Sequence, residues 1–173
     1  MPTQLPPNEL GYLVVSEINK LGFCGGLLLV TNTGRPIEFH CTAPVVANRA
    51  QQILYGATLK EFLVCDQIGI SLLDKLKHKP DAILIQERQL SELATQVDFP
   101  VVLVDQQTPA PDAQEVTADH GQSLEIADQR FEIFGSNTDR AEQVIRAFAE
   151  NLPITEPFER IREAINEAHS EAA

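Results

Sequence analysis

The chain has 173 residues, 43% of them hydrophobic, and a formal net charge of −12. That length allows one well-packed core, while the negative charge disfavours non-specific binding to phosphate backbones and anionic lipid surfaces. The sequence therefore predicts no nucleic-acid partner and no membrane partner. The charge is uneven: residues 1–105 hold 11 acids against 8 Lys and Arg, and residues 106–173 hold 14 against 5. The acidic second part is interpreted as a solvated surface, with docking of a basic partner as the alternative.

The cysteines indicate the compartment. Cys24, Cys41 and Cys65 are odd in number, lie in apolar surroundings, and form neither a CxxC pair nor a Cys/His cluster at zinc spacing. Such thiols are typical of buried, reduced cysteines in a cytoplasmic protein without a metal or other cofactor. Residues 1–10 are proline-rich, lack the pattern of a signal peptide, and are predicted to be a flexible arm. No apolar run approaches the length of a membrane span.

The first elements read as strands followed by a helix. Residues 12–18 and 27–30 are apolar and residues 37–42 alternate in polarity, so we expect strands, the last two forming a hairpin. Gly25-Gly26 is interpreted as a bend before a buried strand, with close approach to a ligand as the alternative. A helix should follow, capped by Thr42 or Asn48 and ending before Gly56. Its apolar stripe, which should face the core, is Val46, Ala50, Ile53 and Leu54.

Residues 58–104 predict helices and two buried strands. Thr58 and Glu61 fit a capping box for a short helix, and Asp66 fits the N-cap of a further helix. His78, near its cationic C-terminal end, is interpreted as a partner of the helix dipole. Residues 82–85 and 101–104 are apolar strands joined through a helix at residues 89–97. This order predicts a parallel βαβ crossover.

The C-terminal third predicts a hairpin and two helices. Residues 106–121 have the composition of a linker. Residues 124–126 and 131–134 predict the two strands of a hairpin, and Asp139 with Glu142 fits a capping box at the start of a helix. In the last helix, Phe158, Ile161, Ile165 and Ala168 should face inward, with His169 exposed. We expect an α/β fold, or α+β, with helices packed on a mixed sheet. Its parts would be an arm over 1–10, a core over 11–105, a linker over 106–121, and a smaller unit over 122–173. Whether that unit joins the main sheet is left open.

The polar row of strand 37–42 provides the candidate site. Glu38 and His40 point to the same face, about 7 Å apart at a rise of roughly 3.3 Å per residue, so the carboxylate could orient the imidazole as a general base. Arg49, Gln52 and Tyr55, on the following helix, are the candidate ligand-binding residues. The alternative is that these polar groups are solvated or satisfy one another structurally, and the sequence favours it.

No motif in the sequence specifies a reaction. Phosphate-binding glycine loops, a nucleophile elbow and HExxH are absent. The order of elements resembles the cytidine-deaminase-like fold, but Ala43-Pro44-Val45 and Gln86-Glu87-Arg88 stand where that family's zinc signature would be. GRPIEFHCTAP…RAQQILYG, within residues 11–105, resembles a planctomycete-type family of conserved bacterial proteins, a resemblance that implies a bacterial cytoplasmic protein and no activity. The sequence thus favours a non-catalytic interaction or regulatory protein, with a homo-oligomer or a protein partner. The alternative is a small-molecule-binding domain or enzyme using Glu38, His40 and Arg49.

Overall fold

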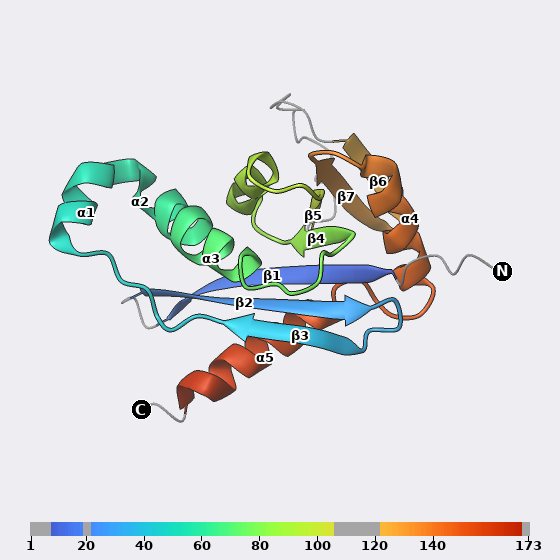
Figure 1. Ribbon diagram of the computed structural model, residues 1–173, viewed down its shortest axis with the longest axis horizontal. Coiled ribbons are helices and arrows are strands. Elements are labelled where there is room, and N and C mark those ends of the chain that lie inside the picture. The colour runs from blue at the N-terminus through green and yellow to red at the C-terminus, as the bar shows by residue number, and fades with distance from the viewer. Residues whose placement is uncertain (1–7, 19–21, 106–121, 171–173) are drawn as a thin grey trace.

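One mixed sheet organises the protein. The computed structural model describes residues 8–18, 22–105 and 122–170. Within them, seven strands lie in the order β3-β2-β1-β4-β5-β7-β6 (Figure 1). The strands are β1 (Glu9–Ile18), β2 (Gly22–Thr31), β3 (Pro36–Cys41), β4 (Ala82–Ile85), β5 (Val101–Val104), β6 (Gln122–Ile126) and β7 (Gln129–Phe134). The predicted mixed sheet is confirmed, and the fold is α+β.

The strand pairings reproduce the predicted hairpins and crossover. β1, β2 and β3 pair antiparallel, whereas β4 is parallel to both β1 and β5. β7 pairs antiparallel with β5, with Val102 opposite Ile133. The C-terminal hairpin therefore extends the main sheet, which answers the question that the sequence left open. The predicted linker and most of the predicted arm lie outside the described residues.

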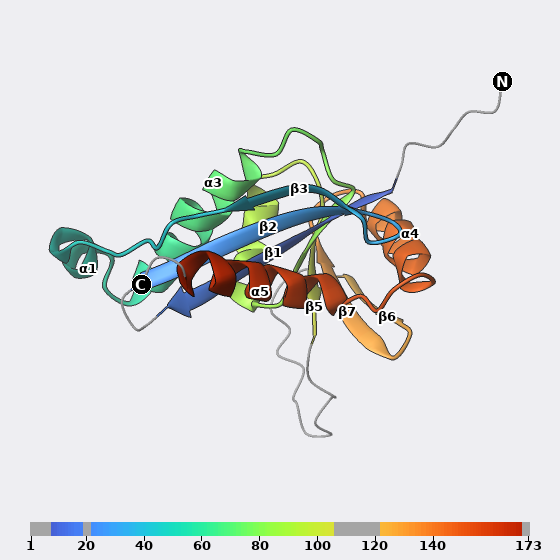
Figure 2. The same ribbon diagram turned by 90° about the horizontal axis from the view of Figure 1, so that it is seen from below.

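Helices cover both faces of the sheet (Figure 2). On one face lie α4 (Thr138–Ala149) and α5 (Glu156–Ser170). On the other lie a helical run and a 3-10 helix, η3 (Arg88–Thr95). The run is composed of α2 (Leu59–Glu61), a π-helical segment η2 (Phe62–Gly69) and α3 (Ile70–Leu73). Strand alternation divides β1 between two cores, because Tyr12 and Val14 pack in the first and Leu13 and Val15 in the second.

Gly25 and Gly26 lie inside β2, which corrects the expectation of a bend. A Cβ on Gly25 would stand 2.2 Å from Ile68 Cγ2 on one face of the sheet. A Cβ on Gly26 would stand 2.6 Å from Ile161 Cγ2 on the other face. The two glycines thus let helices on both sides approach the same point of the strand.

Helix α1 (Arg49–Tyr55) forms where predicted but does not pack as predicted. Asn48 caps it, with Gln51 completing the capping box. The expected core stripe is instead exposed: Ile53 is 66% exposed and Leu54 82%. No residue of α1 is buried, because the helix projects away from the sheet and no other element covers its apolar side (Figure 1).

Several predicted caps are wrong. Thr58 Oγ1 donates to the carbonyl of Tyr55 at 2.7 Å and caps no helix. Asp66 lies within the π-helical segment, which continues directly from α2 into α3. The N-cap residue of α4 is Asn137, in the left-handed region at φ +57°, whereas Asp139 lies in the first turn.

Helix α5 covers the sheet with three of the four predicted side chains. Phe158, Ile161 and Ile165 are buried, and Phe158 meets Tyr12 edge to face at a centroid distance of 4.9 Å. Ala168 is exposed instead. His169, expected in solvent, is half-buried, with its Nε2 2.8 Å from Cys24 Sγ.

The three cysteines are unpaired, as predicted. Cys24 and Cys65 are buried, but Cys41 is exposed at the end of edge strand β3, which corrects the expectation that all three are buried. In the part of the chain that the structure describes, no helix combines the length and apolarity needed to cross a bilayer.

Candidate functional site

The predicted Glu38–His40 pair forms. His40 Nε2 lies 2.9 Å from Glu38 Oε2, and both side chains extend from β3. The Glu38 side chain is only 8% exposed. A carboxylate so close to full burial requires hydrogen-bond donors to replace water.

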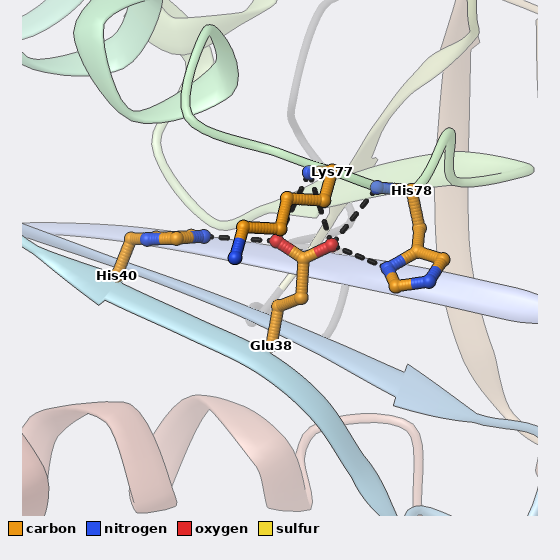
Figure 3. A network of polar contacts seen from close by, with 4 residues as sticks. All are labelled: Glu38, His40, Lys77 and His78. Atoms are coloured by element: carbon orange, nitrogen blue, oxygen red, sulfur yellow. Dashed lines mark hydrogen bonds and ion pairs between the residues drawn. The ribbon is translucent and has the colours of Figure 1, made fainter.

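Those donors come from the connection between α3 and β4 (Figure 3). The backbone N–H of Lys77 donates to both carboxylate oxygens, at 3.0 and 3.1 Å. His78 contributes its backbone N–H at 2.9 Å and its ring Nδ1 at 2.5 Å from Oε1. Burial alone raises the pKa of the Glu38 carboxyl, but the hydrogen bonds from His40, Lys77 and His78 outweigh it and lower the pKa to about 2.

We call Glu38, His40, Lys77 and His78 the Glu38 cluster. Its hydrogen bonds connect β3 to the α3–β4 connection, so the cluster acts as a brace between the two. A carboxylate with a pKa near 2 is a weak base. His78 takes part in the brace, whereas the sequence had suggested a helix-dipole partner. The partners Lys77 and His78 could not be predicted from the sequence, because Lys77 is 39 positions away from Glu38 along the chain.

The other predicted site residues lie elsewhere, on α1. Arg49 is exposed, Gln52 donates to the carbonyl of Ala47 at 3.1 Å, and the Tyr55 ring stacks on Phe62 at 3.9 Å. None of the three has a recorded contact with Glu38 or His40. The structure thus brings together two of the five predicted residues.

A cleft that the sequence did not indicate lies at the carboxyl ends of β1 and β4. β1 and β4 are parallel neighbours, but the chain leaves β1 toward β2 and leaves β4 toward β5, on opposite sides. Such switch points are where open sheets bind ligands. The cleft has a volume of about 240 Å³. Its lining includes Ser16 and Glu17 from β1, Gln86 and Glu87 after β4, and Arg162 from α5.

The polar side chains of the cleft are held by neighbours. Arg162 donates to Gln86 Oε1 and, at 3.0 Å, to Glu159 Oε1. Gln89 Nε2 donates to Glu87 Oε2 at 2.6 Å. Glu17 is exposed at the end of β1. Two glutamates and one arginine therefore line a common space, together with the apolar residues Leu13, Val15 and Leu90.

Sequence reasoning passed over this cleft, although one signal was present. Gln86 and Glu87 directly follow a buried strand predicted to be parallel to its neighbour, which is where ligand-binding side chains gather. The contribution of Arg162 could not be read from the sequence, because it depends on α5 lying across β1 and β2.

The protein thus has a mixed sheet covered on both faces, with a polar cleft at its switch point, the place where open sheets bind ligands. The solved structures that share this fold include endonucleases. Human endonuclease V matches with a TM-score of 0.61 and 15% identity, over 96% of this chain and 87% of that chain. Its catalytic domain matches with a TM-score of 0.59 and 14% identity, over 95% and 85%. Endonuclease V of Ciona intestinalis, solved with inosine-containing DNA, matches with a TM-score of 0.59 and 10% identity, over 96% and 87%. No protein-family model and no curated protein matches the sequence.

These likenesses correct three expectations. The sequence favoured a non-catalytic interaction protein, offered a small-molecule-binding domain or enzyme as the alternative, and excluded nucleic acid as a partner. These expectations do not agree with a fold shared with a nuclease that is seen on DNA. The exclusion of nucleic acid rested on the net charge of −12, whereas binding depends on the charges that face the ligand. The solved structures reported above as sharing this fold are endonucleases V, whereas the order of elements had suggested a resemblance to the cytidine-deaminase-like fold.

Proposed function

We propose that the protein is an enzyme that processes nucleic acids by cleaving phosphodiester bonds in the cleft at the ends of β1 and β4. The observation that carries the proposal is the position of this cleft. Glu17, Glu87 and Arg162 line a cleft at the switch point of a sheet, and the fold is similar to that of human endonuclease V over 96% of the chain.

Each cleft residue has a role suited to this chemistry. The carboxylates of Glu87 and Glu17 accept the proton of an attacking water, as a general base requires. Arg162 offers a planar guanidinium, which matches phosphate geometry and offsets the negative charge that develops on the phosphoryl oxygens. Gln86 holds that guanidinium in the resting state. Water then attacks phosphorus, the bond to one sugar oxygen breaks, and solvent protonates the leaving oxygen.

Many nucleases hold two metal ions at the phosphate that they cleave. The described residues contain no group of three or more His, Cys, Asp or Glu side chains that could hold a metal ion. The cleft supplies only Glu17 and Glu87 as carboxylates. The residues described therefore do not fit such a centre, and the roles above rely on the side chains of the chain alone.

The compartment proposed for this activity is the bacterial cytoplasm. Three unpaired thiols support a reducing compartment, and the resemblance of residues 11–105 to conserved bacterial proteins supports the source.

The test is a cleavage assay on labelled single-stranded and duplex DNA and RNA, including an inosine-containing strand. Each substrate is incubated with and without Mg²⁺. We expect cleavage by the parent protein, a loss of at least about 100-fold in Glu87→Gln, because a general base contributes about 10²–10⁴-fold, and a smaller loss in Glu17→Gln. Glu163→Gln is the matched control, because Glu163 is an exposed acid next to Arg162 on α5.

Two results would contradict the proposal. One is the absence of cleavage on every substrate, with or without Mg²⁺, by a protein shown to be folded. The other is equal cleavage by Glu87→Gln and Glu163→Gln, which would mean that the activity comes from a different site or a contaminant.

A further inference from the structure

A cationic segment interrupts the acidic surface. Lys75, Lys77 and Lys79 are three of the five lysines in the chain, and all three side chains are exposed. They lie in the α3–β4 connection, at the amino end of β4, whereas the cleft lies at its carboxyl end. Because β4 has four residues and a strand rises about 3.3 Å per residue, the segment and the cleft are separated by roughly 13 Å along the strand.

These lysines differ from five of the arginines in their ion pairs with acids of the protein. Arg88, Arg140, Arg146, Arg160 and Arg162 each form an ion pair with an acid of the protein. No such pair is recorded for Lys75, Lys77 or Lys79 among the described residues. Of the nearby acids, Asp81 is paired with Arg140 at 3.1 Å, Glu38 accepts the donors of its own cluster, and Asp74, which precedes Lys75, is exposed to solvent. The ammonium groups are therefore available to an external anion.

The Glu38 cluster keeps this segment in place. Glu38 accepts the backbone N–H groups of Lys77 and His78 from across the fold (Figure 3). A lysine on a braced backbone retains only side-chain freedom, so less entropy is lost when it contacts a ligand. A buried carboxylate with a pKa near 2 stays charged throughout the physiological range, and the brace persists with it.

We infer that Lys75, Lys77 and Lys79 form a contact surface for the phosphate backbone of a nucleic acid. The inference rests on the proposed function, because this surface would supply the sequence-independent binding of nucleic acid that the cleft of an acidic protein requires. A strand held in the cleft would need about four nucleotides to cover the separation, at about 3.4 Å per phosphate of one strand. Each lysine–phosphate contact releases counterions, so binding through this surface falls steeply with salt.

The test measures binding of the full chain to a fluorescein-labelled 24-base-pair DNA duplex by fluorescence anisotropy at 25–200 mM salt. The variant is the triple Lys75→Gln, Lys77→Gln, Lys79→Gln. The matched control is the triple Arg35→Gln, Arg49→Gln, Lys60→Gln, which removes the same charge from three exposed residues outside the segment. If all three lysines contact phosphate, the slope of log K against log salt should fall by about 2–3 in the segment variant and remain unchanged in the control.

The outcomes separate this inference from the proposed function. Equal losses of slope in the two triple variants would attribute binding to overall charge and would overturn the inference of a lysine contact surface. An unchanged slope in the segment variant, or no binding by the parent protein, would also overturn it. If the parent binds but does not cleave, and only the segment variant loses slope, the surface stands and the proposed function fails. If Glu87→Gln loses cleavage but keeps the parent's slope, both stand.

Discussion

Replacing Glu38 by Gln tests the brace between β3 and the α3–β4 connection. The substitution keeps the shape of the side chain but removes its charge and places an amide NH₂ where one carboxylate oxygen stood. The backbone N–H groups of Lys77 and His78 would then compete for a single acceptor. Because Glu38 is only 8% exposed, water cannot freely satisfy the donor that is left without a partner.

The magnitude follows from the pKa of the Glu38 carboxyl, which is lowered from its ordinary 4.5 to about 2. At about 1.4 kcal/mol per pKa unit, that difference corresponds to about 3 kcal/mol of stability. His78 is 53% exposed, so solvent weakens part of the interaction. We therefore expect Glu38→Gln to lose about 2–3 kcal/mol at pH 7. The melting temperature should fall by about 5–10 °C, at 2–4 °C per kcal/mol for a chain of this size.

The loss should depend on pH in one direction. A carboxyl whose pKa is lower in the folded state binds its proton first in the unfolded state. Its stabilisation is therefore complete above the unfolded pKa, near 4.5, and disappears as the pH falls toward the folded value of about 2. The difference in unfolding free energy between parent and Glu38→Gln should accordingly be constant from pH 7 to about 5 and shrink below that.

Urea unfolding at several pH values between 7 and 3, followed by circular dichroism, measures this difference. Glu163→Gln, which changes an exposed acid, should stay within about 0.5 kcal/mol of the parent. Equal stability of parent and Glu38→Gln at pH 7 would refute the reasoning. A difference that persists unchanged to pH 3 would assign the loss to packing rather than to the carboxylate's charge.

Three further predictions concern packing and thiols. Phe158→Ala should lower the unfolding free energy by about 3–5 kcal/mol in urea titrations, and an unchanged midpoint would mean that α5 does not cover the sheet. Gly25→Ala should lower the unfolding free energy by about 1–3 kcal/mol, because its Cβ would stand 2.2 Å from a methyl group of Ile68. An unchanged unfolding free energy would show that the helical segment η2 can move away from β2. Titration with a disulfide reagent should modify Cys41 first and find three thiols after unfolding, since Cys24 and Cys65 are buried and burial raises the Cys65 pKa to about 11. Fast native modification of all three would contradict this order.

The elements that the sequence predicted correctly are those set by local chemistry. Apolar runs located β4 and β5, and two alternating runs located the C-terminal hairpin, whose turn at Ala127 and Asp128 has φ values of +53° and +64°. The Asn48 cap of α1 was among the predicted alternatives, because Asn48 and Gln51 are only three positions apart. Such short-range signals need no knowledge of the rest of the fold.

The misjudged features depend on what the fold places opposite each residue. The apolar side of α1 has the periodicity of a core helix, but no element lies over it, and periodicity cannot report that absence. Gly25 and Gly26 have the composition of a bend, and only the helices on both faces explain their place in a strand. Glu38 and His40 were correctly suspected of pairing, whereas the cleft at β1 and β4 required the sheet order.

The position of α5 has a consequence during synthesis. The helix is synthesised after β1 and β2, the strands on which it packs. The contact between Cys24 and His169 spans 145 positions. Until α5 emerges, the part of β1 and β2 that it covers stays exposed, and nascent chains or chains truncated before α5 would display this apolar surface to solvent and to one another. A stop codon near residue 153 should thus yield an aggregating fragment rather than a smaller domain, and the cell would have reason to shield the growing chain until α5 can dock.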